Sequence, residues 1–176
     1  MRGPASEHPP SGSRPWRVLA VNRYGVRPGL LIADARNTLY LLRFDPLRSL
    51  ELSTGSAMIG SRMFHALGYW VPEHYLLYLH RSDLVASPKG EQINAVGRAE
   101  KLDEEDIALL FAKSAKDQAR GYRAVALRIP PGFKLIGPLQ LFNRRTDDPN
   151  DIVPHEPRGD LRGLHLISAW LGINWI

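Results

Sequence analysis

The stretch that decides the fold is GLLIADARNTLYLLRF, residues 29–44. Two apolar runs flank a polar tip at residues 35–38, and this pattern is typical of a β-hairpin. Asn37 is the tip residue best suited to a positive φ, because asparagine tolerates the left-handed conformation. The stretch therefore predicts two antiparallel strands early in the chain.

Three further segments have the apolar, β-branched or aromatic composition of strands. They are WRVLAVNRY at residues 16–24, HYLLYLH at residues 74–80 and YRAVALRI at residues 122–129. With the hairpin, they predict an α+β protein whose antiparallel sheet is built early in the chain.

The first predicted helix covers residues 53–68, STGSAMIGSRMFHALG. Ser53 or Thr54 is expected to cap its N-terminus, and Gly68 lies where a C-terminal cap belongs. Its apolar stripe of helical period consists of Ala57, Ile59, Gly60, Met63, Phe64 and Leu67. The glycines within it suggest close packing on a flat surface such as a sheet.

Two more helices are predicted later in the chain. One covers residues 103–120, with Asp103 as N-cap, acidic residues in the first turn and basic residues toward its end. The other, at residues 158–171, is apolar on most sides and is expected to need a covering surface.

Composition limits the classes of protein. There is no cysteine, so disulfides, thiolate zinc sites and iron–sulfur clusters are excluded. The net charge is +5, but the basic residues are interleaved with acids and form no run of five, which argues against a dedicated nucleic-acid binder. Residues 1–15 hold four prolines, two glycines and three serines and are expected to form a disordered tail. We expect no membrane span, no signal peptide and, by default, a cytoplasmic protein.

One acidic stretch, RTDDPNDIVPHEPRGDLRG at residues 145–163, is a candidate site. Its potential ligands are Asp147, Asp148, Asp151, His155 and Glu156. Carboxylates could bind a hard cation, but the alternating register of a calcium loop is absent. The favoured interpretation is a proline-bounded loop that leads into the last helix. Phosphate-binding glycine loops, the HExxH zinc pattern and the GxSxG nucleophile motif do not occur.

Three segments together resemble a family of uncharacterised bacterial proteins that is distantly similar to the protein-kinase-like superfamily, near the HipA-type and phosphoinositide-kinase-like folds. They are GVRPGLLIADARNTLYLLRFDP, ALGYWVPEHYLL and RTDDPNDIVPHEPRGDLRGLHLISAWL, and the resemblance covers about residues 17–171. It implies a kinase N-lobe-like antiparallel sheet with a packed helix, followed by the first helices of an incomplete second lobe, as one domain over residues 16–176. ATP and magnesium are its implied ligands.

The departures from this family affect the expected activity. Arg43 stands where the family has a lysine that contacts phosphate, and Ala57 stands where it has the glutamate that orients that lysine. After AWL the chain reads GINWI, where the family continues toward its catalytic loop. We expect a truncated, catalytically inactive kinase-like protein with no catalytic residue and no metal site, in which Arg43 is a vestigial nucleotide contact. The alternatives are an interaction module that self-associates through its apolar C-terminal helix, and a basic nucleic-acid binder.

Overall fold

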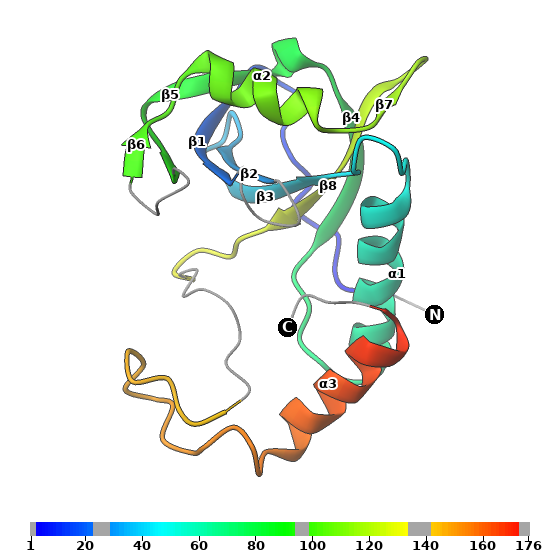
Figure 1. The fold of residues 1–176 in the computed structure, drawn as a ribbon, viewed down its shortest axis with the longest axis vertical. Coiled ribbons are helices and arrows are strands. Elements are labelled where there is room, and N and C mark those ends of the chain that lie inside the picture. Colours follow the sequence, from blue (N-terminus) through cyan, green and yellow to red (C-terminus); the bar gives the residue numbers. More distant parts are fainter. Residues whose placement is uncertain (1–2, 23–28, 94–98, 134–141, 173–176) are drawn as a thin grey trace. The chain divides into compact units, whose positions relative to one another are not determined.

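The computed structural model describes residues 3–22, 29–93, 99–133 and 142–172. The chain divides into two compact units, Met1–Gly132 and Phe133–Ile176. The first unit holds a mixed, open sheet of eight strands with helices α1 (Leu52–Ala66) and α2 (Glu104–Ala112), and the second holds α3 (Gly159–Trp170) (Figure 1). The protein is therefore α+β. In the parts of the chain that are described, no helix combines the length and apolarity needed to cross a bilayer.

The predicted hairpin is the centre of the sheet. Strands β2 (Gly29–Ala33) and β3 (Leu39–Phe44) are antiparallel, and Asn37 in the connecting turn has a φ of 59°, so both predictions are confirmed. The carboxylate of Asp34 accepts hydrogen bonds from the amides of Arg36 and Thr38, each at 2.9 Å, and so fixes the turn.

The remaining strands extend the sheet on both sides of the hairpin. They are β1 (Trp16–Asn22), β4 (His74–Leu79), β5 (Leu84–Ile93), β6 (Ala99–Lys101), β7 (Lys116–Asp117) and β8 (Gly121–Arg128). The strand order is β4-β8-β3-β2-β1-β5-β6, with β7 paired to β8. The prediction of a purely antiparallel sheet is wrong, because β5 pairs with β1 in parallel. Residues 23 and 24 of the first predicted strand lie outside the described residues.

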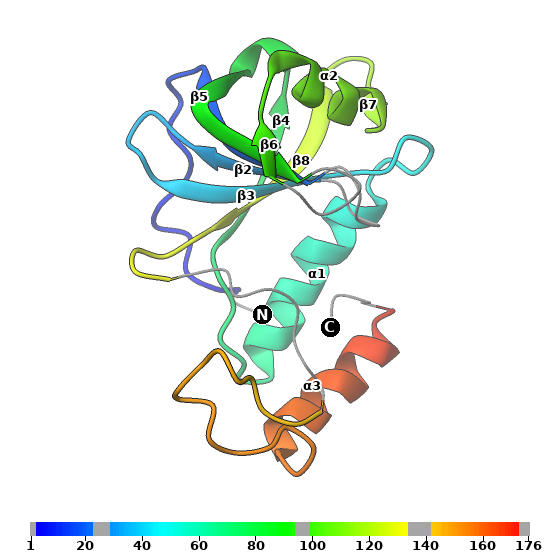
Figure 2. The ribbon, with the colours of Figure 1, turned by 60° about the vertical axis from the view of Figure 1, so that its left-hand side comes forward.

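The two faces of β3 contact different helices (Figure 2). Tyr40, Leu42 and Phe44 belong to the main core, which includes Ile107, Leu110 and Phe111 of α2. Leu41 lies on the opposite face, against a smaller cluster formed by Ala57 of α1 with Val125 and Leu127 of β8. Helices α1 and α2 therefore cover opposite faces of the central strands.

Helix α1 departs from its prediction at its start and in its stripe. Glu51, with a φ of 71°, is the N-cap residue, and neither Ser53 nor Thr54 caps the helix. The buried side is lined by Ala57, Gly60 and Phe64 among others, whereas Ile59 and Leu67 are exposed. Gly68 has a φ of 87° just after the C-terminus, as expected for a terminating glycine.

Helix α2 is shorter than predicted. Asp103 caps it, with reciprocal bonds between the Asp103 and Asp106 side chains and main chains, which confirms the predicted start. The helix ends at Ala112 instead of residue 120, because the next residues pair with other parts of the chain. The prediction for the last helix matches α3 closely.

Candidate functional site

Arg43 lies on β3 between two strands of the sheet. Its registered neighbours are Gly29 on β2 and Val125 on β8. Side chains alternate along a strand, so Arg43 shares the face of Leu41, on which α1 packs. Ala57 of α1 belongs to the same cluster as Val125, so the helix position expected to face Arg43 does lie over the neighbouring strand.

Helix α1 brings no carboxylate to this face. Its sequence, LSTGSAMIGSRMFHA, contains no Asp or Glu. Glu51 lies just before the helix and pairs with Arg123, with 2.8 Å between Oε1 and Nη1. A kinase-like lobe holds its strand lysine with a helix glutamate, and α1 cannot supply such an ion pair.

His74 adds a second basic group to the same part of the sheet. Its imidazole is buried, and Nδ1 lies 2.7 Å from the carbonyl oxygen of Pro72. Burial lowers the pKa of His74, and the nearby charge of Arg43 lowers it further, whereas the bond to Pro72 acts the other way. His74 is therefore neutral at pH 7, and its buried Nε2 atom has no hydrogen-bond partner among the described residues.

Asp45 attaches the start of α1 to the end of β3. It is 1% exposed, and its two carboxylate oxygens accept from the main-chain N–H and the hydroxyl of Thr54, each at 2.8 Å. This bond satisfies an amide in the first turn of the helix, which otherwise has no intrahelical partner. Asp45 thereby positions the helix that covers Arg43. Sequence analysis assigned no role to it.

The acidic stretch of the second unit is held together by its own contacts. Asp151 accepts from the amide of Arg145 at 2.6 Å and lies 2.8 Å from Nε2 of His155, which is buried. The hydrogen bond from Arg145 lowers the pKa of Asp151, and His155 lowers it further. Arg158 lies near the other carboxylate oxygen, at 3.6 Å.

The other acids of the stretch also have protein partners. Asp147 pairs with Arg145 at 2.8 Å, Asp148 accepts from the amide of Asn150 at 2.9 Å, and Glu156 accepts from the amide of Asn143 at 2.8 Å. Among the described residues, no three His, Asp or Glu side chains gather as metal ligands would. The stretch is therefore a loop built by its carboxylates, and the candidate ligands converge on no common point.

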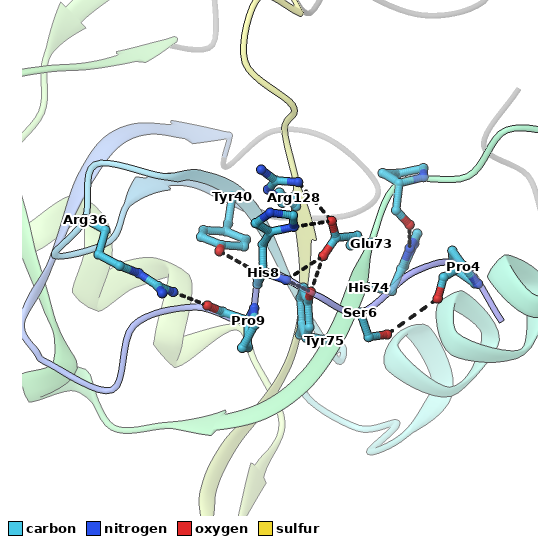
Figure 3. Close-up of polar contacts among 11 residues, drawn as sticks. Pro4, Ser6, His8, Pro9, Arg36, Tyr40, Glu73, His74, Tyr75 and Arg128 are labelled. Atoms are coloured by element: carbon cyan, nitrogen blue, oxygen red, sulfur yellow. Dashed lines mark hydrogen bonds and ion pairs between the residues drawn. The ribbon is translucent and has the colours of Figure 1, made fainter.

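A polar cluster that sequence analysis missed joins the N-terminal segment to the sheet (Figure 3). The Glu73 side chain faces His8, Tyr75 and Arg128, with 2.9 Å to Nδ1 of His8 and to Nη1 of Arg128. Burial raises the pKa of Glu73, but the hydrogen bonds from Tyr75, His8 and Arg128 outweigh it and lower the pKa to about 2. Burial and the bond to Glu73 raise the pKa of Tyr75.

Nothing in the sequence marks this cluster in advance. Glu73 and His8 are far apart in the chain, and residues 1–15 have the composition of a tail. In the structure residues 3–15 form no helix or strand, yet their main chain is bonded to the sheet at several points. The mobility of this segment in solution stays a prediction.

Comparisons of the chain with protein-family models, with curated proteins and with solved structures find no match.

Proposed function

We propose that this chain is a kinase-like protein without phosphotransferase activity, as its sequence resemblance implies. The observation that carries the proposal is that the helix packed on the Arg43 face of β3, α1, contains no carboxylate. In protein kinases, a strand lysine and a helix glutamate must both be in place for the phosphates to be positioned. Here α1 follows β3 directly and packs on the Arg43 face, but it contributes Ala57.

The loss of the ion pair affects catalysis more than binding. Phosphoryl transfer depends on positioning and on neutralising charge, so a basic strand residue that faces a helix without a glutamate supports little rate acceleration. Magnesium has no fitting set of ligands among the described residues. Arg43 retains a charge that can contact a phosphate, with neutral His74 beside it. A retained function would therefore be nucleotide binding without transfer.

Two measurements on the purified chain test this proposal. Incubation with radiolabelled ATP should give no autophosphorylation or transfer above a mock preparation. If ATP raises the melting temperature, Arg43→Ala should abolish the rise. Arg48→Ala is the matched control, because Arg48 is an exposed arginine in the turn after β3. Phosphate transfer by the intact chain, or a thermal shift that survives Arg43→Ala, would contradict the proposal.

The second candidate function is a non-catalytic interaction module, and the exposure of α3 favours it. Ser168 is the one buried residue of this apolar helix, whereas Leu166 and Trp170 are 71% and 75% exposed. Within the second unit, Phe142, His155, Leu161 and Leu166 are among the residues that line an open, largely apolar pocket of about 440 Å3. Exposed apolar surface of this kind is typical of contact sites on soluble proteins.

A further inference from the structure

The N-terminal segment contacts the sheet mainly through its main chain. The amide of His8 donates to Oε2 of Glu73 at 3.0 Å and to the hydroxyl of Tyr75 at 2.9 Å. The hydroxyl of Tyr40 donates to the carbonyl oxygen of His8 at 2.8 Å. Arg36 donates to the carbonyl oxygen of Pro9 (Figure 3), and the amide of Ser11 donates to Asp34 at 2.9 Å. The sheet thus pairs with the main chain at residues 8, 9 and 11.

Apart from Arg36, whose side chain is 57% exposed, the groups on the sheet that make these contacts are fixed by the fold itself. Tyr40 is fully buried in the main core, and the Asp34 side chain is held in its hairpin turn. Glu73 is held by Arg128 and by Tyr75, which donates to it. The segment itself is shallowly seated, since the His8 side chain remains 50% exposed. Side chains that are fixed in the sheet and a segment that lies exposed on them are the arrangement expected of a peptide-binding site.

The prolines of the segment suit this site because they keep the main chain extended and present carbonyl oxygens to its donors. Pro9 fixes its own φ and keeps His8 extended, and Pro10 does the same to Pro9, so this part of the segment is confined to the β or polyproline region. Neither proline has an N–H group that needs an acceptor, and the carbonyl oxygens of His8 and Pro9 meet donors from Tyr40 and Arg36. Aromatic side chains that donate to the carbonyls of an extended proline segment are a recurring mode of peptide recognition.

We propose that Asp34, Arg36, Tyr40, Glu73 and Tyr75 form a binding site for extended, proline-containing peptides, which residues 8–11 of this chain occupy as a displaceable ligand. The segment is held weakly enough to be displaced, because the free energy of its main-chain hydrogen bonds is offset by the entropy lost in ordering it. A proline-containing segment of another protein that presents the same pattern of amides and carbonyls competes for the same groups. This site is separate from Arg43, and it does not depend on the chain being kinase-like.

Amide hydrogen exchange on the isotopically labelled full-length chain tests the proposal. The amides of His8 and Ser11 should exchange more slowly than in a free peptide, because both donate to side chains of the site. An excess of the unlabelled peptide GPASEHPPSGS, residues 3–13, should speed their exchange. The same peptide with Pro9→Gly and Pro10→Gly should compete less well, since its unbound state is more flexible.

A pair of variants on one strand adds a control. Tyr75→Phe removes a hydroxyl that contacts the segment and should speed exchange at His8. Tyr78→Phe removes a hydroxyl from the same strand. The Tyr78 ring contacts Arg120 and its main-chain carbonyl accepts from Arg14, and Phe keeps both groups, so exchange at His8 should not change. A dimer that Tyr75→Phe prevents would also support the site, occupied by a second copy.

Two results would overturn the proposal. If the amides of His8 and Ser11 in the full-length chain exchange as fast as in the free peptide, there is no site. If these amides are protected and saturating peptide does not speed their exchange, the segment is a permanent part of the fold.

Discussion

Glu73 shows how one carboxylate joins distant parts of this chain. It is in contact with His8 of the N-terminal segment, with Tyr75 of β4 and with Arg128 at the end of β8. Its side chain is only 12% exposed, so its charge is stabilised by these hydrogen bonds and the ion pair more than by water. The stability of the first unit should therefore depend on the ionisation of Glu73.

The lowered pKa of Glu73 predicts that the protein loses stability as the pH falls. This pKa falls from 4.5 to about 2 in the folded protein. A lowered folded pKa contributes stability that is fully present above the unfolded pKa and is lost as the pH falls toward the folded one. Unfolding free energy should therefore decrease between about pH 4.5 and pH 2, and Glu73 should account for about 3 kcal/mol of that decrease.

Urea unfolding of Glu73→Gln at several pH values measures this contribution. The variant should be less stable than the parent at pH 7, and the difference should shrink toward pH 2. Glu91→Gln is the control, because Glu91 is exposed on β5. A constant difference between the parent and Glu73→Gln at all pH values would show that Glu73 is not the titrating group.

For single residues, the sequence predicted the element on which a residue lies better than it predicted the contacts of its side chain. The apolar run of residues 39–44 placed Arg43 correctly on a strand next to α1, because that pattern is local. The neighbour His74, the cap from Asp45 and the partners of Glu73 depend on contacts between segments far apart in the chain. In the acidic stretch, the composition was informative, but only the geometry shows that each carboxylate is satisfied within its loop.

Among the elements, predictions based on strong local signals are confirmed. Predicted boundaries that depend on tertiary contacts are wrong. Asp103 was predicted as a cap because its acceptor and the N–H that it bonds are three residues apart. The end of α2 could not be predicted in this way. Leu47 donates to the carbonyl of Lys113 and Ala115 donates to that of Asp45, so the segment after β3 pairs with the residues that would continue the helix.

The link from β3 to α1 yields a prediction about stability. Asp45→Ala should leave the N–H and hydroxyl of buried Thr54 without their acceptor, which costs about 2–3 kcal/mol of unfolding free energy. Thr54→Val removes only the hydroxyl and should cost less. The double variant should show coupling, because both side chains form one hydrogen-bonded pair. Chemical denaturation of the four proteins measures each value, and strictly additive effects would show that the pair does not act together.

The whole molecule differs from its predicted form mainly through β5. Its sequence, LVASPKGEQI, contains Pro and Gly and lacks the apolar alternation of a strand. Parallel pairing with β1 nevertheless places Leu84 beside Trp16 and brings α2 against the main core. A long-range parallel pairing leaves no local signal, which explains why the sheet was predicted to be antiparallel.

The second unit leads to a prediction about self-association. Leu166 and Trp170 of α3, together with Ile152, present exposed apolar surface. Residues 173–176, which add Ile173, Trp175 and Ile176 to the predicted apolar surface, lie outside the described residues. Covering this surface by a second copy removes apolar area from water, which is favourable at roughly 25 cal/mol per Å2. We therefore expect the purified chain to sediment as oligomers whose share rises with concentration, and to bind a hydrophobic dye.

Two sets of variants separate this surface from other causes of association. Leu166→Ser with Trp170→Ser should give a monomer with less dye binding. Leu109→Ser is the matched control, because Leu109 is an exposed leucine of α2 and should leave association unchanged. Tyr75→Phe should also leave it unchanged, since association through α3 does not involve exchange of the N-terminal segment. An intact chain that stays monomeric over a wide concentration range, without binding dye, would rule out α3 as an interface between copies.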